Sequence, residues 1–252
     1  MGPMDMERVR ARLPEREIAW FHTTDSTMTE AARLASLGCP AGTAVVAEEQ
    51  LLGQGRLGRA WHSERYAGLY VSVILRPGLP AAAFPALTLA LGLAAADAIA
   101  RATGVACDLR WPNDLLVGAK KCAGILTQFA DGVVIAGIGI NVNHTSFPED
   151  IERVATSLRL ISGSEQSREI LLVELLESID GFCRILEENG KETILRLFTQ
   201  ASSYAAGRRV IVEQDGAVLR GVTAGLDESG FLRLRKDDGM ECVIMAGGLR
   251  PA

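Results

Sequence analysis

Residues 50–61 read Gln50-Leu51-Leu52-Gly53-Gln54-Gly55-Arg56-Leu57-Gly58-Arg59-Ala60-Trp61, and this glycine-rich stretch limits the choice of fold more than any other. The spacing of its glycines, Gly53-x-Gly55-x-x-Gly58, is that of the phosphate-binding turn of dinucleotide-binding domains. Such a turn requires a helix to open directly after the glycines, with its N-terminus on a pyrophosphate. Residues 59–63 start no apolar-periodic helix, and no acidic residue follows about 20 positions later to hold a ribose hydroxyl. We therefore interpret the stretch as a loop and not as a Rossmann site.

Two interpretations of this loop remain. One is an ordinary mobile surface loop. The other is a loop that closes over an anion, because Arg56 and Arg59 can offer guanidinium groups to a carboxylate or phosphate beside backbone N–H groups. The glycines between the arginines cost the loop conformational entropy, which favours the anion-closing loop.

The composition is that of an ordinary globular protein. Of the 252 residues, 48% are hydrophobic and 23% are charged, which suffices for one large domain and a second small one. The net charge of −5 gives no electrostatic reason to expect a nucleic-acid partner. The 5 cysteines include no Cys-x-x-Cys pair, so we expect reduced thiols and a cytoplasmic protein.

We expect neither a secretion signal nor a membrane anchor. The N-terminus, Met1–Arg12, is charged and lacks an apolar core. The run 81–100 is rich in alanine and leucine, but Pro85, Gly92 and Asp97 interrupt it. A buried helix is the better interpretation of this run, and a membrane partner is not expected.

The apolar pattern predicts an α/β (α+β) domain with a mixed sheet and helices against one face. Capping residues and a 3.6-residue apolar period predict helices over residues 27–37, 84–103, 170–179 and 192–203. Apolar runs predict strands over residues 43–47, 69–75, 106–110, 115–117, 124–129 and 133–141. Asp131-Gly132 between the last two strands predicts a hairpin turn.

The pattern of apolar residues changes near residue 206, from helical periods to short apolar runs. Short strands are expected over residues 210–212, 218–222, 231–234 and 242–245, about ten residues apart, with glycine-containing turns between them. This spacing is typical of a small β-barrel. The prediction is a large first domain over residues 1–205 and a barrel domain over residues 206–252.

The segment Arg110-Trp111-Pro112-Asn113-Asp114 allows two interpretations. Its local sequence favours an ordinary turn. The alternative is that Asn113 and Asp114 orient a nucleotide phosphate or its Mg²⁺.

Two further segments lie on expected strands. In Lys120-Lys121, successive side chains of a strand point to opposite faces, so one ammonium group can look toward the site side of the sheet. Gly137 and Gly139 interrupt an otherwise strong strand, which weakens it unless something must approach its backbone closely.

Taken together, these segments resemble the biotin–protein ligases from about Ile18 to the C-terminus. The shared motifs, in chain order, are Asp25-Ser26-Thr27, Gln50, Gly55-Arg56-x-Gly58-Arg59-x-Trp61, Trp111-Pro112-Asn113-Asp114, Lys121-x-Ala123-Gly124-Ile125-Leu126 and Gly137-Ile138-Gly139-Ile140-Asn141. Each motif alone is weak or moderate, whereas all of them in this order are specific. The chain departs from the family at Gln54, where an arginine is usual.

The resemblance implies an enzyme that forms biotinyl-5′-AMP from biotin and ATP and transfers biotin to a lysine of a biotin carboxyl carrier protein. It also implies a catalytic domain of the biotin/lipoate ligase type and an SH3-like barrel. Some relatives repress transcription through an N-terminal helix-turn-helix domain. Because about 25 residues precede Ser26, too few for such a domain, we expect a monofunctional ligase without a nucleic-acid partner. A homodimer is compatible with the sequence.

The resemblance also implies a set of site residues. The biotin side would comprise Ser26, Thr27, Gln50, Gln54, Gly55, Arg56, Lys121 and Gly124. The ATP and adenylate side would comprise Gly53, Gly58, Arg59, Trp61, Asn113, Lys121, Gly139 and Asn141, with Trp61 near the adenine. Lys121 would bridge the biotin carboxylate and the α-phosphate, and Arg56 would be the chief cation of the closing loop. Asp114 would orient or deprotonate the acceptor lysine and hold Mg²⁺.

Two other functions compete with this one. A lipoate or octanoate ligase or transferase shares the fold, and Cys122 could serve octanoyl transfer as a nucleophile. By strand alternation, however, Cys122 faces away from Lys121 and into packing. A non-catalytic biotin-binding module would bind its ligand without turning over ATP. The Gly-Arg-x-Gly-Arg-x-Trp loop favours biotin over lipoate.

Overall fold

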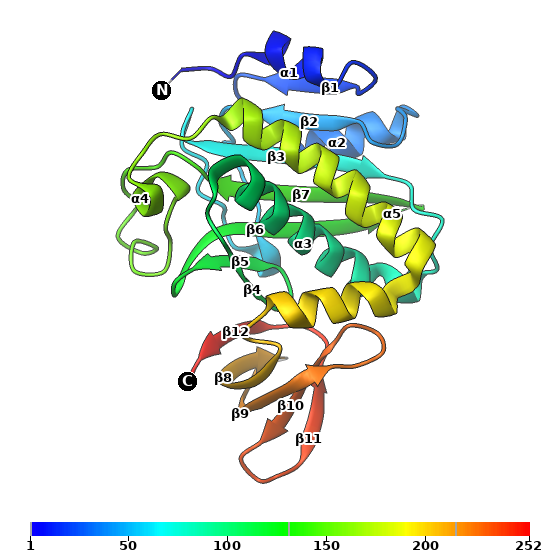
Figure 1. Cartoon of the computed structure of the whole chain (residues 1–252), viewed down its shortest axis with the longest axis vertical. Helices are drawn as coiled ribbons and strands as arrows, with labels where there is room; N and C mark the ends of the chain where they lie inside the picture. Colours follow the sequence, from blue (N-terminus) through cyan, green and yellow to red (C-terminus); the bar gives the residue numbers. More distant parts are fainter. Residues whose placement is uncertain (1, 131, 215) are drawn as a thin grey trace.

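The computed structural model describes residues 2–130, 132–214 and 216–252. These residues form two sheets (Figure 1). The large sheet has the strand order β1-β2-β3-β7-β6-β5-β4, and the small one has the order β11-β10-β9-β8-β12. The pair β1–β2 is parallel and the other neighbouring pairs of the large sheet are antiparallel. The predicted mixed α/β fold, with a separate small antiparallel sheet at the C-terminal end, is confirmed.

The elements have the following bounds. The large sheet consists of β1 (Ile18–Phe21), β2 (Ala44–Ala47), β3 (Gly68–Leu75), β4 (Asp108–Arg110), β5 (Asp114–Val117), β6 (Lys120–Ala130) and β7 (Val133–Asn141). The helices are α1 (Met6–Arg12), α2 (Thr27–Ser36), α3 (Phe84–Thr103), α4 (Leu158–Ser162) and α5 (Arg168–Ala201), with short 3-10 turns at Arg56–Gly58 and Ala81–Ala83. The small sheet consists of β8 (Ala206–Gln214), β9 (Ala217–Leu226), β10 (Leu232–Lys236), β11 (Glu241–Ile244) and β12 (Gly248–Pro251).

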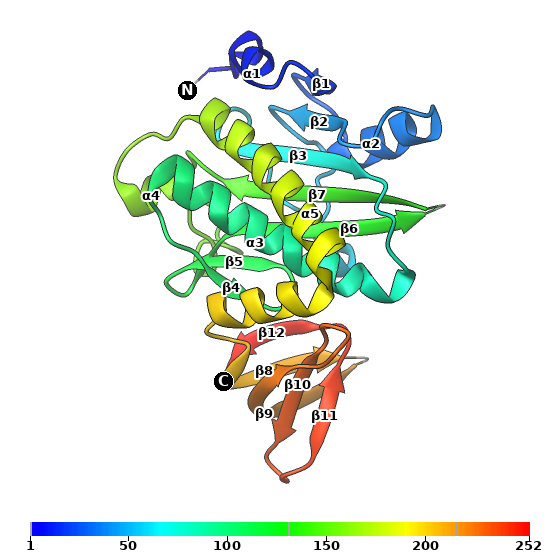
Figure 2. The same cartoon turned by 45° about the vertical axis from the view of Figure 1, so that its right-hand side comes forward.

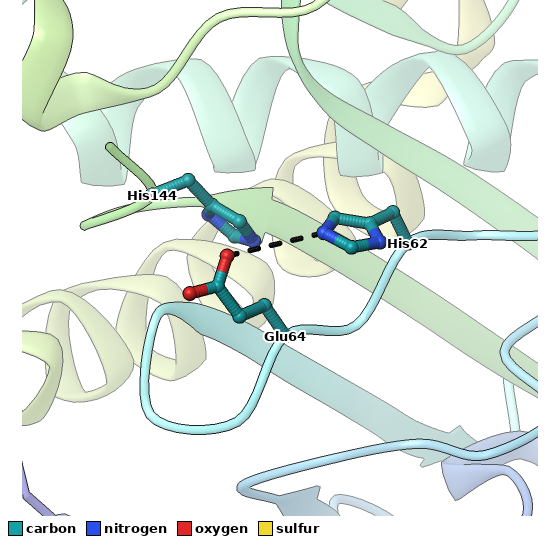
Figure 3. A group of neighbouring side chains, drawn as sticks. All are labelled: His62, Glu64 and His144. Atoms are coloured by element: carbon teal, nitrogen blue, oxygen red, sulfur yellow. Dashed lines mark ion pairs between the residues drawn. The ribbon is translucent and has the colours of Figure 1, made fainter. Parts of the chain in front are cut away.

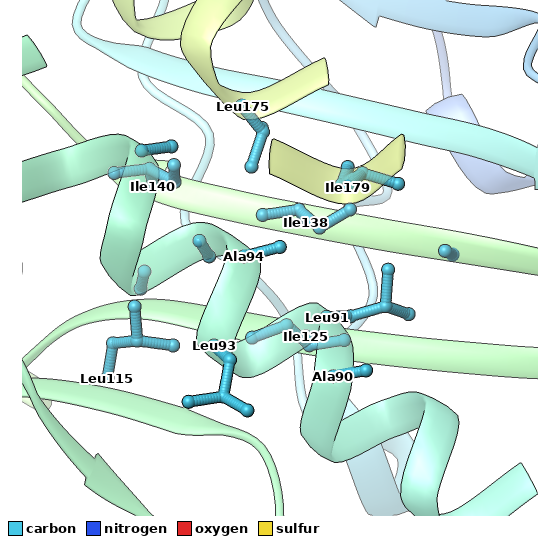
Figure 4. Close-up of a cluster of buried hydrophobic side chains, with 14 of the residues drawn as sticks. Ala90, Leu91, Leu93, Ala94, Leu115, Ile125, Ile138, Ile140, Leu175 and Ile179 are labelled. Carbon is cyan, nitrogen blue, oxygen red and sulfur yellow. The ribbon is translucent and has the colours of Figure 1, made fainter. Parts of the chain in front are cut away.

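The main core lies between the large sheet and the helices α3 and α5, which cover one of its faces (Figures 1 and 2). Figure 4 shows Leu91 and Ala94 of α3 close to Ile125 of β6 and Ile138 of β7. Burial of each such large aliphatic side chain contributes roughly 1.5–3 kcal/mol. Helix α3 has the length and hydropathy of a membrane span, yet it packs against α5 and the sheet, as expected of a core helix.

The expectation that the helices cover only one face of the sheet is wrong. Helix α2 lies on the opposite face, where Met28 and Ala31 pack against Val45, Ile74 and Ile135. The cause is visible in β2, whose four residues are all buried. A strand without apolar–polar alternation is covered on both faces, and α2 supplies the second cover.

Several local expectations are refined by the structure. The N-cap of α2 is Ser26, whose side chain accepts a hydrogen bond from Met28 N at 3.3 Å. The two helices expected after residue 168 form α5, with a break at Gly190, whose φ is 78°. The expected hairpin joins β6 to β7 at the pair Ala130↔Val133, although Asp131 lies outside the described residues. Helix α1, strand β1, helix α4 and strand β12 were not expected.

The small sheet begins with β8 and contacts the large domain directly. The indole Nε1 of Trp111 donates a hydrogen bond of 3.0 Å to the carbonyl of Gly230, and Trp111 is buried. A side chain from the predicted site segment therefore anchors the C-terminal part of the chain. The exact division into domains at residue 205 stays a prediction.

A buried ion pair joins the end of β2 to the start of α5. Arg168 Nη1 lies 2.5 Å from Glu48 Oε2, and the two residues are 5% and 0% exposed. Glu48 Oε1 also accepts from Met4 N at 2.6 Å, while Arg168 Nη2 donates to the carbonyl of Gly2 at 2.6 Å. Sheet, helix and N-terminal segment thus converge on one pair of charges.

We predict that Glu48→Ala lowers the free energy of unfolding by about 3–5 kcal/mol, because it leaves the Arg168 guanidinium buried without its carboxylate. Urea denaturation followed by circular dichroism measures the loss. Glu213→Ala is the control, since it breaks an exposed pair with Arg250 and should cost less than about 1 kcal/mol. Equal losses in the two variants would contradict the prediction.

Candidate functional site

Two adjoining cavities open beside β6 and β7. The inner cavity, of about 40 Å³, brings together predicted residues from five segments: Ser26, Thr27, Gln50, Gln54, Gly55, Arg56, Trp61, Asn113, Lys121, Gly124 and Gly139. The outer cavity, of about 190 Å³, is lined by Arg59, Asp114 and Asn141 and shares Gly55, Arg56, Trp61, Asn113 and Lys121 with the inner one. Residues that are distant in the sequence therefore form one continuous site.

Two predicted residues line neither cavity. A Cβ on Gly53 would lie 2.7 Å from the carbonyl oxygen of Trp61, so this glycine permits close packing within the loop. Gly58 has a φ of 71°, a left-handed conformation that glycine adopts without strain. Both residues shape the loop and do not face the cavities.

Other lining residues escaped the sequence analysis. They are Met28 and Val71 in the inner cavity, and His62, Phe147, Ile151, Val154, Ala155 and Gly247–Leu249 in the outer one. Gly247–Leu249 belong to the C-terminal part of the chain, and no local pattern there points to a site. Their approach depends on how the small sheet packs.

The floor of the inner cavity is a hydrogen-bonded polar cluster at the N-terminus of α2. Gln50 Oε1 accepts hydrogen bonds from Thr27 N at 2.9 Å and from Thr27 Oγ1 at 3.0 Å. Gln50 Nε2 donates to Ser63 Oγ at 3.0 Å, and Thr27 Oγ1 lies 2.8 Å from Ser72 Oγ. These bonds fix the amide of Gln50, so the floor offers preset donors and acceptors to a polar ligand group.

Glycines let other groups lie directly on the strands. Gly124 and Gly139 are register partners in β6 and β7. A Cβ on Gly139 would lie 2.4 Å from Trp61 Cε2, and one on Gly124 would lie 2.9 Å from Lys121 Nζ. In this structure the indole of Trp61 is therefore what approaches the strand backbone closely, as the glycines led us to expect of some group.

The indole nitrogen of Trp61 is buried and has no hydrogen-bond partner within the described part of the chain. A buried N–H group without a partner is costly and needs an explanation. Trp61 lines both cavities, so a ligand acceptor that reaches this nitrogen would satisfy it.

Lys121 lies at the junction of the two cavities. Its Nζ is 2.6 Å from Asp114 Oδ1 and 5.2 Å from the centre of the Trp61 ring, and the side chain is 29% exposed. A β-bulge sets this position, because Leu115 pairs with Ala123 whereas the next residue, Leu116, pairs with Lys121. The bulge changes which face of the sheet a side chain takes.

The bulge also determines where the neighbouring cysteine lies. Cys122 is fully buried, its Sγ donates to the carbonyl of Leu115 at 3.5 Å, and it lies 3.7 Å from Cys107 Sγ. Its hydrogen bond with Cys107 and its burial raise the pKa of the Cys122 thiol well above the ordinary value. The expectation that Cys122 faces away from Lys121 and into packing is confirmed, and the thiol does not serve the cavities.

Asp114 is held as a charged carboxylate. Burial by itself would raise its pKa, but the adjacent charges of Lys121 and Arg110 outweigh burial and lower the pKa below the ordinary value. Oδ1 pairs with Lys121 and Oδ2 pairs with Arg110 Nη2 at 2.6 Å. Asp114 therefore orients the lysine, and its low pKa makes it a poor proton acceptor.

The expected magnesium ligand does not fit this arrangement. Mg²⁺ is usually held by one or two carboxylates together with substrate phosphates. Both oxygens of Asp114 are already paired with cations, and Arg110 and Lys121 repel a third positive charge. The expectation that Asp114 holds Mg²⁺ is therefore not supported, and we derive no step through that ion.

The glycine-rich loop folds over both cavities without starting a helix of ordinary length. Residues 56–58 make a single 3-10 turn in which Leu57 has a φ of 57°, a costly conformation for a residue other than glycine. Arg56 Nη1 donates to Asn113 Oδ1 at 3.1 Å and to the carbonyl of Gly247 at 3.5 Å. Burial lowers the pKa of Arg56, while Asp114 opposes that shift.

Asn141 supports the wall of the outer cavity. Its side chain is buried and donates from Nδ2 to the carbonyl of Thr156 at 3.0 Å. That bond holds the segment around Ala155, which forms an isolated bridge with Lys121. In this structure Asn141 thus positions a wall of the cavity.

His144 lies beside the outer cavity, where its ring is stacked on Phe147 with centroids 5.2 Å apart. Burial, with a smaller contribution from His62, lowers the pKa of His144 to about 4. The imidazole is therefore neutral near pH 7.

Comparisons with known proteins agree with this geometry. Residues 20–144 match the biotin/lipoate A/B protein ligase family, and residues 206–247 match the biotin protein ligase C-terminal domain. The chain is 36% identical over 228 residues to the bifunctional ligase/repressor BirA of Bacillus spizizenii. The aligned region covers 88% of this chain and 70% of the relative. It is 33% identical over 257 residues to the biotin–[acetyl-CoA-carboxylase] ligase of Mycobacterium tuberculosis, covering 98% and 94%.

A solved structure gives the same picture. The biotin protein ligase from Aquifex aeolicus in complex with biotin and ATP superposes with a TM-score of 0.84 at 32% identity, covering 94% of this chain and 99% of that one. From the family match and from the identity to a relative that it covers almost completely, the chain belongs to the biotin/lipoate A/B protein ligase family, and within it to the biotin–protein ligases.

Proposed function

We propose that the protein forms biotinyl-5′-AMP from biotin and ATP and transfers the biotinyl group to a lysine of a biotin carboxyl carrier protein or domain. The observation that carries this proposal is the position of Lys121, which lines both the small inner cavity with its polar floor and the larger outer cavity. An ammonium group at such a junction can contact the ends of two anionic substrates at once.

The lining of the inner cavity matches the chemical groups of biotin. The ureido group of biotin has two N–H donors and one carbonyl acceptor, and the cluster of Ser26, Thr27 and Gln50 offers both kinds of partner. Val71 and Leu126 give apolar walls for the rest of the ring system and the acyl chain. The carboxylate of the chain would then reach toward Lys121 and Arg56.

The outer cavity suits ATP. The rings of Trp61 and Phe147 line it and can pack against a nucleobase, while Arg59 and Asn113 supply polar groups for the sugar and phosphates. The α-phosphate would lie at the shared wall, next to Lys121. This arrangement brings the attacked phosphorus to the mouth of the inner cavity.

Formation of the adenylate requires two negatively charged groups to come into contact. The biotin carboxylate must attack the α-phosphorus of ATP and expel pyrophosphate, which brings one anion onto another. Positioning and charge neutralisation supply most of the catalysis in such a transfer. Lys121, oriented by Asp114, serves both the approach and the transition state. Arg56 and the loop would then shield the mixed anhydride from water.

In the second step the acceptor lysine loses a proton and attacks the acyl carbon of biotinyl-AMP, which forms the amide bond, breaks the acyl–phosphate bond and expels AMP. Asp114 has a lowered pKa and two cationic partners. We therefore assign it the role of orienting Lys121 and not that of the base that deprotonates the acceptor lysine. The five cysteines are free thiols, which supports a reducing compartment such as the cytoplasm. A homodimer and the lack of a nucleic-acid partner stay predictions.

Lipoate or octanoate transfer fits the site less well. Their acyl groups carry no ureido group, so the hydrogen-bonding groups of the inner floor would be left without partners, which a specific site penalises strongly. An octanoyl-transfer mechanism through Cys122 is disfavoured because that thiol is buried on the far side of β6.

The proposed function is tested by exchange of labelled pyrophosphate into ATP, run in parallel with biotin, lipoate and octanoate. We expect exchange with biotin alone. Exchange that requires lipoate or octanoate would replace the proposal by the related ligase. Tight binding of biotin without any exchange would indicate a binding module.

We predict that Lys121→Ala lowers the rate of biotin-dependent pyrophosphate exchange by a factor equivalent to about 3–4 kcal/mol, the typical loss for one donor to a developing anion. Lys120→Ala is the matched control, because the neighbouring lysine is exposed, donates to the carbonyl of Glu152 and lines neither cavity. A Lys121→Ala protein that exchanges at a near-normal rate would refute the role of Lys121.

We predict that Arg56→Gly retains adenylate formation but releases biotinyl-AMP into solution, because the loop loses its anchor on Asn113 and Gly247. Chromatography of free biotinyl-AMP and labelling of a bystander protein measure the leak. Arg65→Gly is the control, since Arg65 pairs with Glu49 and lines neither cavity. An unchanged level of free adenylate in Arg56→Gly would count against the closing loop.

A further inference from the structure

Two histidines and a glutamate meet beside the outer cavity, and none of them has a role in the proposed reaction. Figure 3 shows His62, Glu64 and His144 pointing toward one another. One nitrogen or oxygen from each lies within 4.8 Å of the others, and His62 Nε2 is 3.9 Å from Glu64 Oε2. His62 and Glu64 follow the glycine-rich loop, whereas His144 follows β7.

One ring nitrogen of the buried histidine of this cluster lacks a hydrogen-bond partner among the described residues. His144 is 0% exposed, and its Nδ1 has no hydrogen-bond partner among the residues that the structure describes. Its other nitrogen, Nε2, lies 3.4 Å from Tyr70 Oη. A buried polar atom without a partner costs about 1–3 kcal/mol, so this nitrogen requires an explanation.

The hydroxyl of Tyr70 determines which nitrogen carries the proton. Tyr70 Oη donates its only hydrogen to the carbonyl of Glu64 at 2.9 Å. It can therefore only accept from the imidazole, so His144 carries its hydrogen on Nε2. Nδ1 then carries a lone pair that accepts no hydrogen bond from the residues that the structure describes. A histidine oriented by a hydrogen bond from its other nitrogen is the arrangement found at metal ligands.

We propose that His62, Glu64 and His144 bind a divalent transition-metal ion of the zinc type. Imidazole nitrogens with a carboxylate oxygen are a ligand set for such ions, whereas Mg²⁺ and Ca²⁺ take oxygen ligands. Tetrahedral zinc with bonds of about 2.0–2.1 Å places its ligand atoms roughly 3.3 Å apart. The separations of up to 4.8 Å must shorten by as much as about 1.5 Å to reach this geometry. The side chains of His62 and Glu64, 34% and 44% exposed, can make that adjustment.

The ion has a structural consequence for the site. It joins the segment directly after Trp61 to the segment directly after Asn141, so it fixes the exit of the glycine-rich loop against the end of β7. Three protein ligands leave one tetrahedral position open, and His62 lines the outer cavity. Binding of the ion requires neither biotin nor ATP, and the inference stands apart from the proposed reaction.

The test is titration of the untagged full-length protein with Co²⁺, followed by visible absorption, and then displacement with Zn²⁺, in the absence of nucleotide. We expect one ion per chain. His62→Gln and Glu64→Gln should each weaken binding by at least about tenfold, the loss typical even for a supporting residue of a metal site. Both residues are partly exposed, so the variants are expected to fold, which circular dichroism checks.

Two control variants separate this cluster from other sources of binding. His22→Gln removes the third histidine of the chain. Cys107→Ser removes one thiol of the contact between Cys107 and Cys122. Both should bind as the wild type does. The proposal is overturned if the wild type takes up no Co²⁺ or Zn²⁺ at millimolar concentration. It is equally overturned if His62→Gln and Glu64→Gln bind like the wild type, or if a control variant loses binding instead.

Discussion

The site depends on one lysine that a β-bulge turns to the cavity side of the sheet. Ala123 and Ile125 of β6 face the main core, so strict alternation would send Lys121 into the core and Cys122 into the cavities. The irregular register opposite Leu115 and Leu116 reverses this outcome. Asp114 of the neighbouring strand then holds the ammonium group at 2.6 Å. Partial burial opposes a charge at this point, and the carboxylate offsets that cost, which keeps a cation where two anionic substrates would meet.

The rest of the site is built around this cation from groups that the fold leaves incompletely satisfied. The indole of Trp61 lies on bare glycine backbone, and its nitrogen lacks a partner within the described residues. Leu57 adopts a left-handed conformation. Such features cost stability and persist where the surrounding structure holds them in place. The compensation lies elsewhere, in the core beneath α3 and α5.

The sequence predicted the parts of the fold that local chemistry determines. The helix that ends at Gly104 and the hairpin of β6 and β7 follow from periodicity, capping and turn residues. Most of the residues implied by the family resemblance do line the two cavities. What could not be predicted depends on tertiary packing. Nothing local reveals that Glu48 is fully buried against a helix 120 residues away, or that Gly247 approaches the glycine-rich loop. The position of α2 on the second face was readable in principle, from the unbroken apolar run of β2.

The walls that the two cavities share have a thermodynamic consequence. Lys121, Arg56 and Trp61 line both cavities, so a ligand that moves any of them in one cavity changes the shape and charge of the other. Coupling of this kind is reciprocal, because whatever one ligand does to the affinity for the second, the second does to the affinity for the first. Arg56 extends the coupling to the small sheet through the carbonyl of Gly247. The C-terminal part of the chain is therefore in direct contact with the glycine-rich loop that lines both cavities.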